Sequence, residues 1–331
     1  MTSRETLLLS RSDVSSLLTL GDCITAVESA FRGLGEGRTP SPAILGLPAR
    51  GGGFHIKAAL LPLVTSYFAA KVNGNFFHNA RRFGMPNIQG LILLCNAENG
   101  QPLAVMDSIE ITILRTGAAT AIAAKYLARA GSKVVTICGC GSQGGIQLRV
   151  LAQVLPLECA FAFDVEGDRA ESFARVLSGE LKIKVSAAED LGHALSRSDV
   201  CVTCTPARAP LMPREQIRPG TFVAAVGADS PEKQELDPAL VATSKLVVDA
   251  LSQCSEIGEL HHALDDGLIR REQVHAELAE LVAGRKLGRT SEDEITVFDS
   301  TGTALEDAAA AAEVYERALL AGRGQVFLFS G

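Results

Sequence analysis

The stretch VVTICGCGSQGG, from Val134 to Gly145, decides the fold of this chain. Five strand-like residues run directly into Gly139, Gly141 and Gly144, which have the spacing G-x-G-x-x-G at the start of a predicted helix. In such a loop the first glycine permits a tight turn, the second lets the backbone approach a pyrophosphate, and the third lets helix and strand pack closely. The same spacing also occurs in simple turns, so the surrounding sequence has to decide between a turn and a dinucleotide site.

After Ser132, strand-like and helical segments alternate regularly. The strands read KVVTIC, CAFAFD, IKVS, DVCVTCT, TFVAAVGA and KLVVDA, and helices are predicted over 142–155 and 168–178. This alternation is typical of a parallel sheet with helices on both faces. The second strand ends at Asp164, twenty residues after Gly144, where a carboxylate accepts hydrogen bonds from the adenosine ribose. The context therefore predicts a Rossmann domain that binds a dinucleotide.

Asp164 also predicts which dinucleotide binds. Its carboxylate, with Glu166 close by, would repel the 2′-phosphate of NADPH. Arg169 is expected to lie one helical turn too far away to neutralise that phosphate. The sequence therefore predicts NAD(H) in preference to NADP(H).

The segment before Ser132 has a different pattern of predicted strands and helices. Five short strand-like runs within 43–105 are separated by Gly, Pro and Asn, which predicts an antiparallel sheet. Helical segments are predicted over 22–36 and 108–129, and another follows Asp299. The expected fold class is α/β: a Rossmann domain with a parallel sheet, plus an α+β domain built on an antiparallel sheet.

Composition and charge argue against several classes of partner. The 331 residues are 47% apolar, with a formal net charge of −7 and a pI near 5.5, so no general attraction to nucleic acid or anionic membranes is expected. The N-terminal apolar run contains only three leucines, too few for a signal sequence or a membrane span, which predicts a cytoplasmic protein.

Neither the cysteines nor the histidines predict a metal site. The eight cysteines lie mostly in apolar runs and are expected to be buried thiols. Cys201 and Cys204 form C-x-x-C, but no second pair accompanies them, and they are expected to point to opposite faces of a strand. His261 and His262 are adjacent on a predicted helix, so they are expected to be solvated rather than to share a ligand.

Four further stretches give the chain a specific resemblance. YFAAKVNGN at 67–75, ILRTGAATAIAAK at 113–125, AVGADSPEKQELD at 225–237 and FDSTGTALED at 298–307 are similar to motifs of the ornithine cyclodeaminase/mu-crystallin family, in the same order. In this family a Rossmann domain is inserted after a substrate-binding and dimerisation domain, which the C-terminal helix rejoins. The resemblance implies one domain at 1–116 with 302–331, a Rossmann domain at 117–301, and a homodimer.

The resemblance also implies roles for particular residues. Lys71 and Arg115 would bind the substrate, and Asp229 and Lys71 would handle protons. A guanidinium can hold a carboxylate in a bidentate fork, and a buried lysine has a lowered pKa. Without the motifs, surface cations and a turn aspartate would be the simpler interpretation. The residues implied around the cofactor are Asn87, Arg115, Thr116, Gly139, Gly141, Ser142, Gln143, Gly144, Asp164, Thr205, Lys233 and Ser300.

One departure from the family pattern bears on the substrate. Many members carry an arginine on the strand that corresponds to SPAILGLP, where this chain has Ala43, Ile44 and Leu45. Cyclodeaminases place an acidic residue near the next strand, whereas this chain has Lys57 there. Lys57 either faces solvent or replaces the missing arginine; in the second case three cations converge, which would suit a substrate with two carboxylates, such as iminosuccinate.

The leading hypothesis is an NAD-dependent oxidoreductase that acts on C=N or CH–NH bonds and reduces a small 2-imino acid. Pyrroline-2-carboxylate or ketimine reductase, iminosuccinate reductase and alanine dehydrogenase are the activities the resemblance implies. Two alternatives remain open at this point. One is an ornithine cyclodeaminase that forms proline and ammonia with bound NAD, and the other is a mu-crystallin-like binding protein without turnover.

Overall fold

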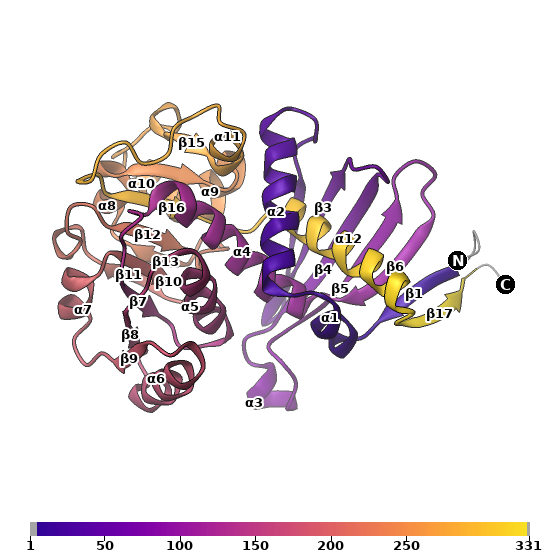
Figure 1. The fold of residues 1–331 in the computed structure, drawn as a ribbon, viewed down its shortest axis with the longest axis horizontal. Helices are drawn as coiled ribbons and strands as arrows, with labels where there is room; N and C mark the ends of the chain where they lie inside the picture. Colours follow the sequence, from indigo (N-terminus) through magenta and orange to yellow (C-terminus); the bar gives the residue numbers. More distant parts are fainter. Residues whose placement is uncertain (1–4, 330–331) are drawn as a thin grey trace. The chain divides into compact units, whose positions relative to one another are not determined.

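The computed structural model describes residues 5–329, which form two compact units. Unit 1 comprises residues 1–118 and 303–331, and unit 2 comprises residues 119–302 (Figure 1). The sequence predicts domain boundaries after residues 116 and 301.

Unit 1 is built on a seven-stranded sheet with the order β17-β1-β6-β5-β4-β3-β2. Neighbouring strands from β2 to β6 pair antiparallel, as the sequence predicts, whereas β1 pairs parallel to β6. The strands are β1 (Glu5–Leu9), β2 (Ala43–Ala49), β3 (Gly52–Leu61), β4 (Tyr67–Asn75), β5 (Ile88–Asn96), β6 (Pro102–Asp107) and β17 (Gln325–Leu328). The local sequence pattern does not predict β1 and β17, because each depends on a partner strand distant in the chain.

One face of this sheet is covered by helix α12 (Ala304–Ala321), against which α2 (Leu20–Gly35) packs. The alanines at 308–312 are buried, and their small side chains let α12 approach the strands closely. We call this covered side the inner face of the sheet. The remaining helices of unit 1 are α1 (Arg11–Leu17), α3 (Asn79–Phe83) and the first half of α4 (Ile109–Leu127).

Unit 2 contains an eight-stranded sheet with the order β15-β14-β16-β12-β10-β7-β8-β9, and every pairing in it is parallel. Its strands are β7 (Val134–Cys138), β8 (Cys159–Phe163), β9 (Lys184–Ala187), β10 (Val200–Thr203), β12 (Phe222–Ala225), β14 (Lys245–Val248), β15 (Ala276–Glu277) and β16 (Thr296–Asp299). The connecting helices are α5 (Ser142–Val154), α6 (Gly167–Leu181), α7 (Leu191–Arg197), α8 (Pro238–Thr243), α9 (Leu251–Ile257), α10 (Glu259–Asp265) and α11 (Leu278–Val282). A separate parallel pair joins β11 (Arg208–Met212) to β13 (Gln234–Leu236).

The strand order of unit 2 reverses at β7. Chain order runs outward through β8 and β9 on one side and through β10 and β12 on the other. In doubly wound sheets, ligands bind beyond the carboxyl ends of the strands at such a reversal. The fold class expected from the sequence, a Rossmann domain combined with an α+β domain, is confirmed.

Across residues 5–329, no single helix is long and apolar enough to cross a membrane. The adjacent helices α1 and α2 reach that length and composition only as a pair, with an 84° bend between them.

Candidate functional site

The glycine loop of unit 2 has the geometry of a phosphate-binding turn. Gly139 has a φ of +102°, and a Cβ there would lie 2.8 Å from the carbonyl oxygen of Cys204. A Cβ on Gly144 would lie 2.0 Å from the carbonyl oxygen of Gly139, so only glycine permits this packing of α5 on β7. Gly141 begins α5 and has open space around its Cα.

The start of α5 can hold an anion. Gly141, at its N-cap, has no side chain that could bond the first backbone N–H groups of the helix. Gln143, in the first turn, has a buried Oε1 that lacks a hydrogen-bond partner among the described residues. The free N–H groups fit the phosphates of a dinucleotide, whereas Gln143 Oε1 can accept a hydrogen bond only from a donor group of a bound molecule.

Asp164 follows β8 and is fixed beside this loop. Its Oδ2 accepts a hydrogen bond from Cys140 N at 2.9 Å, and its Oδ1 accepts one from Glu166 N at 3.0 Å. Arg169 does not lie as far away as the sequence analysis expected: its Nη1 is 3.9 Å from Asp164 Oδ2, and its Nη2 is 2.9 Å from Glu166 Oε2. The reason is that α6 begins at Gly167, so Arg169 lies in the first helical turn, next to the end of β8.

Arg169 also borders a hollow of about 280 Å³ beside the glycine loop. Gly141, Ser142 and Arg149 line the same hollow. An anion in this hollow would therefore lie near a guanidinium as well as near the start of α5.

Glu235 joins the loops that follow β10 and β12. This buried carboxylate accepts hydrogen bonds from Thr205 N at 2.6 Å, Thr205 Oγ1 at 2.7 Å and Gly227 N at 2.9 Å. The sequence analysis did not select Glu235, although it lies in the quoted motif AVGADSPEKQELD. The predicted cofactor residue Thr205 thus donates its hydroxyl proton within the protein, and its loop is held by Glu235.

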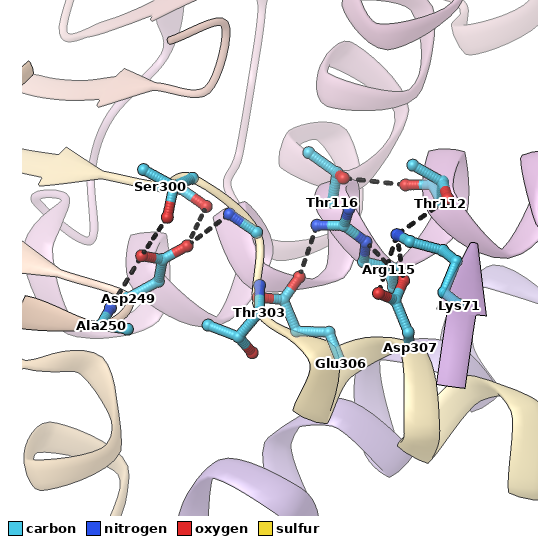
Figure 2. Close-up of polar contacts among 12 residues, drawn as sticks. Lys71, Thr112, Arg115, Thr116, Asp249, Ala250, Ser300, Thr303, Glu306 and Asp307 are labelled. Atoms are coloured by element: carbon cyan, nitrogen blue, oxygen red, sulfur yellow. Dashed lines mark hydrogen bonds and ion pairs between the residues drawn. The ribbon is translucent and has the colours of Figure 1, made fainter. Parts of the chain in front are cut away.

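Asp229 and Lys233, both predicted site residues, form an ion pair on the loop after β12. Lys233 Nζ lies 2.5 Å from Asp229 Oδ1 and also donates to the carbonyl oxygen of Gly227 at 3.1 Å. The Asp229 side chain is 42% exposed, so this acid can reach a bound molecule. At the end of β16, the hydroxyl of Ser300 donates to Asp249 Oδ2 at 3.1 Å (Figure 2).

In unit 1, Lys71 and Arg115 meet two carboxylates that begin α12 (Figure 2). Lys71 Nζ lies 2.7 Å from Asp307 Oδ2 and 3.4 Å from Thr112 Oγ1. Arg115 bonds Asp307 Oδ1 through Nε at 3.1 Å and Glu306 Oε2 through Nη1 at 3.0 Å. Lys71 is 3% exposed and Arg115 is 5% exposed, so these are buried ion pairs.

Glu306 and Asp307 were not selected by the sequence analysis. They close the quoted motif FDSTGTALED, which is the only signal in the sequence that could have identified them. Their contacts also modify the expected role of Arg115, because its Nε and Nη1 already bind protein carboxylates and are not both available for a fork on the substrate.

Lys57 belongs to the same cluster. It lies opposite Lys71 in the pairing of β3 with β4 and is 7% exposed, so of the two alternatives left open by the sequence, the solvent-facing one is wrong. Burial, helped by the charges of Arg115 and Lys57, lowers the pKa of Lys71 to about 7, although Asp307 acts in the opposite direction. Burial raises the pKa of Asp307, but Lys71 and Arg115 outweigh that effect and lower it overall.

The two remaining predicted cofactor residues make contacts within unit 1. Thr116 donates its hydroxyl proton to the carbonyl oxygen of Thr112 at 2.8 Å, one turn earlier in α4. Asn87 accepts a hydrogen bond from Ala80 N at 3.1 Å and closes the turn that contains α3. Their roles toward a cofactor stay predictions.

The cysteines and histidines differ in part from expectation. None of the eight cysteines forms a disulfide. Burial raises the pKa of Cys138, Cys140, Cys201 and Cys204. His261 and His262 are not simply solvated: their ring centroids are 3.9 Å apart, and each ring bonds a backbone carbonyl oxygen. Both residues are half-buried, which helical spacing alone does not predict. Within residues 5–329, no group of three or more His, Cys, Asp or Glu side chains is placed to hold a metal ion.

The fold and the glycine loop define a dinucleotide-binding α/β protein with a second, charged site in its other unit. Known proteins share this organisation. The iminosuccinate reductase of Paracoccus denitrificans is 32% identical over 94% of this chain and 96% of its own length. The structure of an archaeal alanine dehydrogenase dimer with bound NAD has a TM-score of 0.93 and 40% identity, covering 98% of this chain and 99% of the other. The Thermococcus litoralis Δ1-pyrroline-2-carboxylate reductase with NADH and L-proline has a TM-score of 0.91 and 37% identity, covering 97% and 99%.

The model of the ornithine cyclodeaminase/mu-crystallin family matches residues 4–322. The chain therefore belongs to the ornithine cyclodeaminase/mu-crystallin family, as its four motifs predict. The expected enzyme class is an NAD-dependent oxidoreductase that acts on C=N or CH–NH bonds. This class is confirmed, because these relatives are named as reductases and dehydrogenases of such substrates.

Proposed function

We propose that the protein is an NADH-dependent reductase of small 2-imino acids, or of the imines that form from 2-oxo acids and ammonia. The observation that carries this proposal is the buried cluster of Lys57, Lys71, Arg115, Glu306 and Asp307. When Lys71 is protonated, the cluster contains three cations and two carboxylates. A buried cluster in which cations outnumber carboxylates attracts a carboxylate from a ligand.

In the proposed reaction, unit 1 binds the imino acid and unit 2 binds the cofactor. Arg115, Lys71 and Lys57 attract the α-carboxylate, while Glu306 and Asp307 keep the three cations close together in spite of their repulsion. Asp229 supplies the proton that the imine nitrogen takes up when its carbon is reduced. When bound, NADH supplies the hydride.

The same charge balance argues against the cyclodeaminase alternative. A diamine substrate needs a carboxylate for its second amine, but Glu306 and Asp307 are already paired with Arg115 and Lys71. An added cation would lie beside Lys57 and Arg115, and like charges repel most strongly where water is excluded.

We further propose that NADH is preferred over NADPH, by a smaller margin than the sequence alone predicts. Asp164 disfavours a 2′-phosphate, but Arg169 lies within ion-pair distance of it and is 50% exposed. That guanidinium offsets part of the repulsion between Asp164 and the phosphate.

A substrate screen tests the proposed function. NADH absorbance would be followed with Δ1-pyrroline-2-carboxylate, pyruvate plus ammonia, oxaloacetate plus ammonia, and ornithine. We expect NADH oxidation with at least one of the first three, and a strong loss of kcat in Asp229→Asn with an unchanged KM for NADH. Ammonia and proline from ornithine without net NADH oxidation would support a cyclodeaminase instead. Binding of NADH without turnover of any compound would support the binding-protein alternative.

We propose a homodimer as the working assembly. The side of the unit 1 sheet opposite α12, here called the outer face, exposes Phe54, Leu60, Val72, Leu91 and Leu93. It also contains a hollow of about 580 Å³ lined by Phe54, Val72, Phe83, Met85 and Leu91. Exposed apolar area of this kind is typical of a protein interface, and the archaeal alanine dehydrogenase relative is described as a dimer. The cytoplasmic location stays a prediction.

A further inference from the structure

Two polar residues, His55 and Asn73, lie beside the buried cluster that contains Lys57 and Lys71, on the inner face of the unit 1 sheet. His55 lies opposite Asn73 in the pairing of β3 with β4, two residues along from the pair of Lys57 and Lys71. Alternate residues of a strand share a face, so His55 and Asn73 are on the same side of the sheet as the two lysines. At about 3.4 Å per residue, the two pairs are about 7 Å apart.

Asn73 is held in one orientation. It is 7% exposed, and its Oδ1 accepts a hydrogen bond from the fully buried Ser108 hydroxyl at 2.7 Å. A Cβ at Gly90, the residue opposite Asn73 on β5, would lie 2.0 Å from Asn73 Oδ1, so the glycine provides the space for this amide. With the oxygen directed at Ser108, the amide nitrogen of Asn73 offers N–H donors to whatever lies beside it.

The opposite direction along the strands is closed. Two residues on the other side of the lysine pair, Ala59 and Ala69 lie opposite one another and are buried at 5% and 2%. Helix α12 packs over β3 and β4 there, with its own buried alanines. Along the strands, the direction that remains for a molecule whose α-carboxylate binds the lysines is toward His55 and Asn73.

We infer that His55 and Asn73 form the subsite for the substrate side chain and select 2-imino acids whose side chain ends in an oxygen acceptor over aliphatic ones of similar length. This inference rests on the proposed function. Imidazole and amide N–H groups bond such an oxygen directly, whereas an aliphatic group would leave the buried Asn73 donors without a partner. A carboxylate or a hydroxyl oxygen on the side chain meets this requirement.

The test compares matched substrates with NADH as reductant: oxaloacetate plus ammonia, 3-hydroxypyruvate plus ammonia, and 2-oxobutanoate plus ammonia. The wild-type kcat/KM for the better of the two oxygen-bearing substrates should exceed that for 2-oxobutanoate by about ten-fold or more. His55→Leu should reduce the ratio of these two kcat/KM values about ten-fold, chiefly by lowering kcat/KM for the oxygen-bearing substrates. His55→Gln keeps an N–H donor, so its ratio should be close to that of the wild type. His78→Leu, the same change at an exposed position of unit 1, should leave the ratio unchanged.

Two results would overturn the inference. One is a wild-type enzyme that uses 2-oxobutanoate as well as, or better than, both oxygen-bearing substrates. The other is an equal loss with all three substrates in His55→Leu, which would place His55 at the shared α-carboxylate or in the fold. Failure of the proposed function gives a different result, because then neither these mixtures nor Δ1-pyrroline-2-carboxylate would oxidise NADH.

Discussion

Lys71 is the residue whose protonation depends most on its neighbours. Burial and the charges of Arg115 and Lys57 together bring its pKa to about 7, against the opposing charge of Asp307. The unfolded value is about 10.4, so between about pH 7 and pH 10 the unfolded chain binds a proton that the folded chain lacks. In that window, the contribution of Lys71 to stability rises with pH.

A bound carboxylate should reverse this effect. Its negative charge raises the pKa of Lys71, so binding at pH 8 should take up as much as one proton per site. We expect the apparent binding enthalpy of an unreactive carboxylate such as lactate, in the presence of NADH, to differ between phosphate and Tris buffers accordingly. Lys71→Arg, which keeps a fixed charge, should show no buffer dependence. A wild-type protein that binds lactate without proton uptake would contradict this account of Lys71.

Arg169 is the residue to change in testing the choice of cofactor. Asp164 is less suitable, because it also accepts the backbone N–H groups of Cys140 and Glu166, and its loss would disturb the glycine loop. Arg169→Ala should widen the preference for NADH over NADPH in kcat/KM by about ten-fold, since it removes the cation nearest to the 2′-phosphate. Arg175→Ala, on the same helix, serves as the control. An unchanged ratio in Arg169→Ala would mean that Arg169 does not reach the ribose.

At the scale of elements, unit 2 depends on one strand to organise two loops. β13 carries Glu235, whose carboxylate bonds Thr205 and Gly227, and its own backbone is held by Glu259 through Glu235 N at 2.8 Å and Leu236 N at 3.0 Å. Burial raises the pKa of both glutamates. The loops that carry Thr205 and Asp229 are therefore held in place by two buried acids, Glu235 and Glu259.

Glu235→Gln should loosen these loops. An amide cannot accept at both ends, so either the Gly227 N–H or the Thr205 donors would lose their acceptor, at a cost of about 1–3 kcal/mol. We expect the Kd for NADH, measured by fluorescence titration, to rise several-fold, with a smaller effect on the KM of the imino acid. Glu232→Gln, an exposed change on the same loop, should leave both constants unchanged. The idea fails if Glu235→Gln binds NADH as tightly as the wild type.

At the scale of the whole molecule, the outer face of the unit 1 sheet determines the assembly we expect. Leu91→Asp would put a charge on a surface that we propose to be buried in a dimer, and burying an unpaired charge is strongly unfavourable. Sedimentation should therefore show a dimer for the wild type and monomers for Leu91→Asp. Leu287→Asp, at an exposed leucine of unit 2, should remain dimeric. A wild-type monomer at micromolar concentration would disprove the homodimer.

The sequence by itself determined the Rossmann unit and the family. A strand followed by glycines at fixed spacing, and regular alternation of strands and helices, are local patterns whose meaning does not depend on distant residues. The glycine loop was found in this way, whereas Lys71 and Arg115 were selected through the resemblance to the family. The strands β1 and β17 were not found from the sequence, because each is stabilised by pairing with a strand that is distant in the chain.

Only the tertiary structure decided what surrounds Lys57, Lys71 and Arg115. Arg115 and Glu306 are 191 residues apart in the sequence, and no local pattern predicts that α12 brings Glu306 and Asp307 to α4 and β4. The orientation of Lys57 was equally open, since a strand lysine faces solvent or the core according to which face a helix covers. Lys57 is buried beside Lys71 on the face that α12 covers, which determines its orientation. The proposed substrate class follows from the charges that this arrangement brings together.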